Sequence, residues 1–279
     1  MQLLANRWHG MPLEPPFFYG TDFKELFEYN LKKQPSDWRW RDRKVYYTIN
    51  SQGYRCPEFK DINWTESIVM FGCSYVFAPG VDDSETMPSL LSQRLGRPVV
   101  NLGAGSTDDL FQFANTNIIY EEGIRPYAVI YLWPGIHRLT EFLGGVDTEN
   151  WGSWNCHSSG LAKNWITKDN HVRTFLHYLS MSVTNLWKCP ILQYYPYMTF
   201  HKEGRSLNFF QAKNNTTIDD VISKDLWPNI KPWRHIIDAA RDVGYQGNYH
   251  PGPDTLKFWV DEILIPDLEN LGIQAESVT

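Results

Sequence analysis

The sequence lacks the features that mark several large classes of protein. It has no cluster of lysine and arginine dense enough to indicate nucleic-acid binding, and its formal net charge is −6. Its apolar runs fall far short of the ~18 residues that cross a bilayer. Residues 1–10 contain no long apolar segment of the secretory type. We therefore expect neither nucleic acid nor a membrane as a partner. We expect a cytoplasmic location, or the virion or host cytoplasm if the source is viral.

Cysteine is scarce as well, with four in 279 residues. The four lie at Cys56, Cys73, Cys156 and Cys189. No two form a C-x-x-C pair, and such wide spacing is typical of neither a zinc site nor a disulfide framework. We therefore expect buried free thiols.

A group of aspartates resembles a metal site on paper. The group is Asp82, Asp83, Asp108 and Asp109. Helix caps and solvated loop residues are the favoured interpretation, because Asp commonly caps helices. No metal and no organic cofactor is expected.

What the sequence does contain indicates a packed globular chain. Hydrophobic residues make up 42% and charged residues 21%. Residues 1–60 hold aromatic clusters with little periodicity, and we interpret them as an N-terminal arm packed on a main domain of residues 61–279. A short helix capped by Asp22 is expected over residues 22–33. Carbohydrate binding, or contact with an oligomer or assembly partner, is an alternative role for the arm.

Beyond residue 66 the pattern alternates between strands and helices. Strands are expected over residues 67–71, 98–102, 127–133 and 190–195, helices over 87–95, 108–120 and 174–187, and a final helix from Asp254 that Pro266 ends or kinks. A brief strand or helix end is expected over 235–239. This alternation predicts an α/β fold with a mostly parallel sheet and helices on both faces.

Two long stretches, residues 140–170 and 201–232, show no clear periodicity, and we expect them to be irregular. The first contains three tryptophans, at Trp151, Trp154 and Trp165. They would either pack internally or stack on sugar faces, and packing is favoured.

The most informative residues follow the first predicted strand. Gly72 permits a sharp turn, and Ser74 then lies at the carboxyl end of that strand, where α/β sheets place ligands. Its hydroxyl is either a nucleophile or an ordinary turn group. Cys73 is the alternative nucleophile, but its side chain should point away from Ser74.

Two further loops should meet Ser74 at the same edge of the sheet. One spans residues 101–109, and the backbone N–H groups of its Gly103–Ser106 turn, with that of Ser74, are candidate oxyanion donors. The other spans residues 248–253 and carries His250, a candidate general base. His250 is otherwise a structural loop histidine, and the glycine turn is otherwise a plain turn or an anion cradle.

These motifs resemble those of the SGNH (GDSL-type) hydrolases over about residues 66–270. The matching segments are Gly72-Cys73-Ser74, Asn101-Leu-Gly-Ala-Gly-Ser106 and His250-Pro-Gly-Pro253. The resemblance implies a flavodoxin-like three-layer α/β/α sandwich, here with an aromatic-rich N-terminal extension. It also implies hydrolysis of a small-molecule, lipid or glycan ester. Gly105 is then the preferred oxyanion donor, with Ser106 beside it.

Two positions depart from the family pattern. Residues 133–138, Trp-Pro-Gly-Ile-His-Arg, lack the asparagine that donates to the oxyanion, and His137, Arg138 or a backbone N–H would have to replace it. Gly247 stands where the family has its aspartate, so either Asp242 is the acid that orients His250, or a backbone carbonyl holds His250 in a dyad.

The sequence therefore predicts a serine esterase or deacylase of divergent, phage-like or bacterial type. The alternative is a catalytically weak or inactive relative that serves as a binding or structural protein, for example in a virion or surface assembly. A sugar-phosphate or nucleotide binder that uses the glycine-rich turn is a third, weaker hypothesis.

Overall fold

The five strands of the main sheet all run parallel. The computed structural model describes residues 1–6, 8–10, 24–33, 35–38, 41–42, 44–105, 107–134, 138–142, 151–155, 182–183, 185–196, 199–202, 205–208, 230–233 and 251–274. The strands are β1 Ile68–Gly72, β2 Val99–Gly103, β3 Ala128–Leu132, β6 Ile191–Pro196 and β9 Ile230–Trp233. Their order in the sheet is β2-β1-β3-β6-β9. Numbered along the chain this is 2-1-3-4-5, the flavodoxin-like order.

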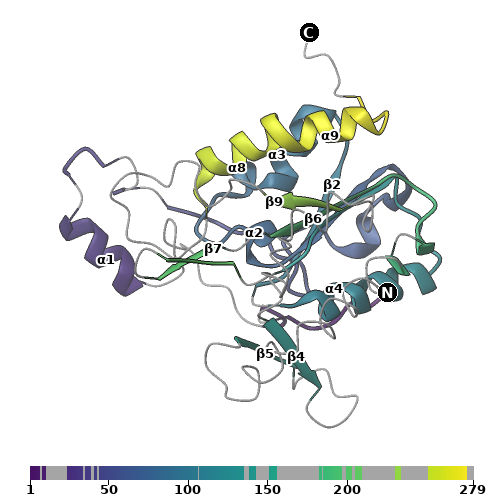
Figure 1. Cartoon of the computed structure of the whole chain (residues 1–279), viewed down its shortest axis with the longest axis horizontal. Helices are drawn as coiled ribbons and strands as arrows, with labels where there is room; N and C mark the ends of the chain where they lie inside the picture. Colours follow the sequence, from purple (N-terminus) through teal and green to yellow (C-terminus); the bar gives the residue numbers. More distant parts are fainter. Residues whose placement is uncertain are drawn as a thin grey trace.

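Helices cover both faces of this sheet (Figure 1). On one face lie α3 Met87–Leu95, α8 Pro253–Trp259 and α9 Ile265–Asn270, and on the other lies α4 Asp109–Glu121. Strand β1 is buried throughout because its side chains alternate between the two cores. Ile68 and Met70 join the α3 side, and Val69 and Phe71 join the α4 side. The predicted fold class is therefore confirmed.

The bounds of helices α3 and α4 follow from local chemistry. The Thr86 hydroxyl caps α3 by accepting the Ser89 N–H at 3.3 Å, and Gly96 ends the helix at a φ of 59°. The Asp108 carboxylate caps α4 by accepting the Phe111 N–H at 3.0 Å. Both helices and the Asp108 cap are confirmed.

The last helix does not end at Pro266. Helical backbone continues from α8 through a π-helical turn, Val260–Leu264, into α9, which ends at Asn270. In a regular α-helix the proline ring would clash with the carbonyl four residues earlier. The wider turn immediately before α9 relieves that clash. Of the two predicted alternatives, the end at Pro266 is wrong, and the irregularity takes the form of a π turn before it.

An ion pair ties α3 to this π turn. Arg94 donates to the two carboxylate oxygens of Asp261 at 2.8 and 3.0 Å, and Lys257 donates to the same carboxylate. The hydrogen bond from Arg94 lowers the pKa of Asp261 below its usual value. The pair therefore stabilises the fold above the unfolded-state pKa, and this contribution is lost as the pH falls through the lower folded-state pKa.

We expect Asp261→Asn to lower the free energy of unfolding by about 0.5 kcal/mol at pH 7, the scale of partly exposed ion pairs. At about pH 2, below the unfolded-state pKa of an aspartate, the difference from the parent should be smaller, because protonation of the parental carboxyl weakens the ion pair. Urea denaturation at the two pH values measures this. Glu28→Gln is the control, because Glu28 pairs with Lys24 at 3.7 Å on the exposed face of the first helix, α1 Lys24–Lys33. An equal loss at both pH values would contradict the assignment.

Described parts of residues 1–60 belong to the core on the α4 face. Leu3 and Tyr54 are 2% and 0% exposed, and both pack with residues of β1, β2 and β3. The Leu4 N–H donates to Asn115 of α4, whose amide donates to the Tyr54 hydroxyl, both at 2.8 Å. The helix α1 forms over Lys24–Lys33, close to the predicted range. A domain boundary at residue 60 and a partner for this region stay predictions.

The two stretches expected to be irregular contain strands. The antiparallel pairs are β4 Arg138–Phe142 with β5 Trp151–Asn155, and β7 Thr199–Lys202 with β8 Arg205–Asn208. Strand β9 also falls in the second stretch. These strands are short, and Pro232 argues against a strand unless it lies at a sheet edge, as β9 does. The expected element at 235–239 lies outside the described residues, and of the helix at 174–187 only residues 182–183 and 185–186 are described as helical.

Candidate active site

Ser74 is the first residue of a one-turn helix that follows β1 directly. This helix, α2, spans Ser74–Phe77, and Cys73 is its N-cap residue. A Cβ on Gly72 would lie 2.4 Å from Val76 Cγ2 and 3.0 Å from the Leu132 carbonyl oxygen, so only glycine fits at the turn. The turn places Ser74 at the carboxyl edge of the sheet, as predicted from the sequence.

Ser74 is 6% exposed, and among the described residues its hydroxyl makes only a weak contact. Ser74 Oγ lies 4.0 Å from the sulfur of Cys73, a distance at which a hydrogen bond contributes little. Within the described part of the chain, the Ser74 backbone N–H has no hydrogen-bond acceptor. An N–H in this state can donate to an incoming anionic oxygen without first breaking a bond.

The second predicted loop lies beside the first. Gly72 and Gly103 are register partners at the ends of β1 and β2, and the Ala104 N–H donates to the Gly72 carbonyl at 2.9 Å. Ser74 and Gly105 are therefore at equivalent positions, two residues beyond a paired glycine. The Gly105 N–H, like that of Ser74, has no acceptor among the described residues.

Gly103 has a different part in this arrangement. Its N–H donates to the side-chain oxygen of Asn101 at 2.9 Å, which leaves it unavailable to a substrate. A Cβ at Gly103 would lie 2.3 Å from the Phe77 nitrogen, so glycine is needed to let α2 rest on β2. The geometry thus favours Gly105 over Gly103 as an oxyanion donor.

Gln112 of α4 forms hydrogen bonds with both loops. It is fully buried, and its Nε2 donates to the Gly72 carbonyl and to Thr107 Oγ1, both at 2.9 Å. Thr107 Oγ1 in turn donates to the Ala104 carbonyl at 2.7 Å. One side-chain amide therefore fixes the Ser74 turn relative to the Gly105 turn. The sequence carries no motif that would have identified it.

Replacing Gln112 with leucine is expected to lower the free energy of unfolding by about 1–3 kcal/mol, because a buried hydroxyl and a carbonyl each lose a donor. Chemical denaturation measures the loss. Asn117→Leu is the matched control, since Asn117 also lies on α4 and donates to a carbonyl, that of Phe113 at 3.0 Å, but in a partly buried setting. Equal losses in the two variants would contradict this account of Gln112.

Four predicted site residues lie outside the described residues: Ser106, His137, Asp242 and His250. Pro251, the residue after His250, is described and buried, and α8 begins two residues after it. Helix α8 packs against the 3₁₀ turn η3, Asp83–Glu85, which follows the loop after α2. The roles of the four residues stay predictions.

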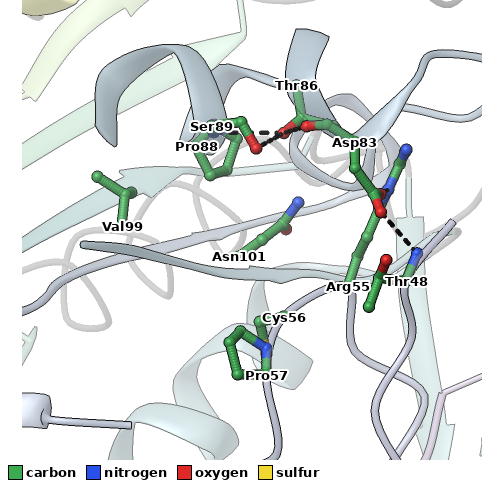
Figure 2. Close-up of a pocket in the computed structure, with 10 residues that line it drawn as sticks. All are labelled: Thr48, Arg55, Cys56, Pro57, Asp83, Thr86, Pro88, Ser89, Val99 and Asn101. Carbon is green, nitrogen blue, oxygen red and sulfur yellow. Dashed lines mark hydrogen bonds and ion pairs between the residues drawn. The ribbon is translucent and has the colours of Figure 1, made fainter. Parts of the chain in front are cut away.

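A cavity of about 370 Å³ is lined by described residues that do not include Ser74. Its walls come from the arm, from the start of α3 and from β2 (Figure 2). The polar groups that face it are already bonded. Arg55 pairs with Asp83 at 2.6 Å, and the Asn101 amide donates to the Val76 carbonyl at 3.0 Å.

The thiols and carboxylates show no metal-binding arrangement in the described ranges. Cys56 and Cys73 are buried and free, and Cys189 is free and half-buried, while Cys156 lies outside those ranges. Burial raises the pKa of the Cys189 thiol to about 11. Among the described residues, no three His, Cys, Asp or Glu side chains are grouped to hold a metal ion.

None of the described helices has the length and apolar character needed to cross a bilayer.

No protein-family model and no curated protein sequence matches the chain. Several solved structures are similar to it. A GDSL-type lipase-like protein from Bacteroides ovatus is 15% identical, with 77% of this chain covered and a TM-score of 0.42. The chain spans 56% of the length of that protein.

Two other similar structures are esterases. A carbohydrate esterase family 2 enzyme with a carbohydrate-binding domain, from Corynascus thermopiles (Myceliophthora fergusii), is 12% identical, with 74% of this chain and 67% of the enzyme covered and a TM-score of 0.45. The SGNH-hydrolase family esterase AlinE4 is 15% identical, with 76% and 97% covered and a TM-score of 0.39. In its overall fold this chain is similar to these GDSL-type and SGNH-type proteins.

Proposed function

We propose that the chain is a serine esterase or deacylase that hydrolyses an acyl ester through an acyl-enzyme. One observation carries the proposal: Ser74 and Gly105 occupy equivalent positions, two residues beyond the ends of adjacent parallel strands, each with a backbone N–H that has no acceptor among the described residues. This arrangement supports a hydroxyl nucleophile beside two preorganised donors for an oxyanion.

In the proposed reaction Ser74 Oγ attacks the acyl carbonyl carbon while His250 accepts the hydroxyl proton and Asp242 orients the imidazole. The N–H groups of Ser74 and Gly105 hold the resulting oxyanion. The bond to the alcohol then breaks, and His250 returns the proton to the leaving oxygen. Water, deprotonated by His250, attacks the acyl-enzyme and releases the acid and free Ser74. The roles of His250 and Asp242 rest on the sequence.

The substrate class is a small-molecule or glycan ester. Because residues 133–138 contain no asparagine, a third oxyanion donor has to come from His137, Arg138 or a backbone N–H. Loss of one such donor lowers a rate by about 10²–10³-fold. The proposal therefore includes slow turnover of simple acetyl and butyryl esters.

The test is labelling of the full chain with a fluorophosphonate, followed by mass spectrometry of the modified peptide. We expect a single adduct on Ser74, absent after heat denaturation. An unlabelled, well-folded chain would overturn the esterase proposal. That result would favour a binding or structural protein, the function that the missing asparagine supports.

A further inference from the structure

Arg55, in the N-terminal arm, forms an unusual set of bonds with the segment that carries Ser74. Its side chain is 2% exposed. Its guanidinium donates to three backbone carbonyls, those of Phe77 at 3.0 Å, Ala78 at 2.7 Å and Val81 at 2.5 Å. A fourth donor, Nε, contacts Asp83 at 2.6 Å (Figure 2). Four of the five donors of this arginine thus hold one short stretch of chain.

The helix that these bonds hold is too short to be stable by itself. A single helical turn such as α2 has almost no internal hydrogen bonding, so its carbonyls need partners elsewhere. The Ser74 carbonyl accepts the Ala78 N–H at 2.8 Å, and the Val76 carbonyl accepts the Asn101 amide at 3.0 Å. The Phe77 carbonyl accepts Arg55. A positive charge at this end of a helix is also electrostatically favourable.

The residue after α2 has an unfavourable backbone conformation. Ala78 has a φ of 60°, the one positive value among the described residues other than glycine. Such a conformation persists only where its surroundings enforce it. Here the Ala78 carbonyl is bonded to Arg55, and the Ala78 N–H is bonded to the Ser74 carbonyl. Arg55 and Ser74 are therefore connected through a single residue.

Aromatic residues of the arm also contact Arg55 and α2. The Arg55 guanidinium lies over the Tyr47 ring, 4.1 Å from its centroid, and Trp8 stacks on Phe77 with centroids 5.5 Å apart. The Tyr47 hydroxyl accepts the Gly80 N–H. The arm thus contacts both α2 and the loop that follows it.

We propose that Arg55 is a positioning residue that holds α2 so that Ser74 is presented for attack, an inference that rests on the proposed esterase function. It acts through the Phe77 and Ala78 carbonyls and does not touch the substrate. The N-terminal arm is then a part of the catalytic apparatus, outside residues 66–270 where the hydrolase resemblance lies.

The test compares Arg55→Met with a matched control, Arg97→Met, in the full chain. Arg97 also donates to a carbonyl and a carboxylate, both of Glu66, and lies over an aromatic ring, that of Tyr127, but it precedes β2 at the amino edge of the sheet. We expect Arg55→Met to slow fluorophosphonate labelling of Ser74 by about 10- to 100-fold, the scale of a small misplacement. Turnover of a p-nitrophenyl ester should lose kcat with little change in KM. Arg55→Lys should recover part of the rate.

Hydrogen exchange supplies a readout that needs no activity. Peptides covering residues 73–83 should exchange faster in Arg55→Met and not in Arg97→Met. If Arg55→Met fails to fold, Tyr47→Phe replaces it, because it deletes only the hydroxyl bonded to Gly80, and it should slow labelling by a few fold.

The test distinguishes failure of the positioning role from failure of the esterase proposal. A labelled parent whose Arg55→Met variant reacts as fast as Arg97→Met overturns the positioning role alone. An unlabelled parent overturns the esterase and the positioning role together, even if the exchange result holds.

Discussion

Replacing Ser74 with alanine is expected to abolish fluorophosphonate labelling and to lower kcat on acetyl and butyryl esters by at least about 10³-fold. Removing the attacking oxygen of a serine hydrolase removes the acyl-enzyme route as a whole, and such losses reach about 10⁶-fold in efficient enzymes. The expected loss here is smaller because residues 133–138 contain no asparagine to act as an oxyanion donor, so we expect the parent itself to be slow. Steady-state kinetics and intact-protein mass spectrometry measure the two effects.

Cys73→Ala is the control for this experiment. Cys73 is adjacent to Ser74 and 4% exposed, so its replacement disturbs the same turn without removing the proposed nucleophile. We expect labelling and kcat within about three-fold of the parent, since truncating a small buried thiol removes little packing. If Cys73→Ala lost activity and Ser74→Ala kept it, the nucleophile would be the thiol.

The second large effect is expected at Gly103, where alanine should lower the free energy of unfolding by about 3 kcal/mol. The added Cβ would meet the Phe77 nitrogen at 2.3 Å and the Val76 carbonyl carbon at 2.7 Å. Both are backbone atoms, so relief requires α2 to move as a whole. Chemical denaturation gives the stability, and the labelling rate of Ser74 should fall along with it.

Gly123→Ala provides the comparison. Gly123 has a φ of 75°, and an added Cβ there would meet no atom within 4 Å. The cost is then only that of the backbone conformation, about 1 kcal/mol, with unchanged Ser74 labelling. Equal destabilisation in the two variants would show that contact with α2 is not what requires glycine at position 103.

The parts of the fold that could be predicted are those with local causes. The helix at Met87–Leu95 has a cap at Thr86 and a stop at Gly96, and both act within a few residues of the helix. The buried strands are continuous apolar runs, and their alternation with helices determines a parallel sheet. Ser74 and Gly105 could be placed at one edge for the same reason, because each follows a strand directly.

The parts that could not be predicted depend on contacts between distant residues. Arg55 contacts carbonyls more than twenty positions away, and backbone carbonyls carry no sequence signal. Gln112 likewise reaches Gly72 across forty positions. The strand β9 includes a proline, and β6 is its one pairing partner within the described residues, so this pairing defines the strand more than its own composition does.

The parallel order of the sheet bears on how the chain is assembled during synthesis. No neighbouring pair in the main sheet closes by a short hairpin, so each pairing waits for an intervening crossover, and such topologies fold slowly. Strands β1, β2 and β3 and helices α3 and α4 are all complete once residue 132 has left the ribosome. Met70, Ile130 and Leu91 share a core with Leu256, Trp259 and Leu264, which are synthesised much later than residue 132. Until those three later residues are synthesised, the apolar face that they cover is exposed to solvent and can aggregate or bind a chaperone.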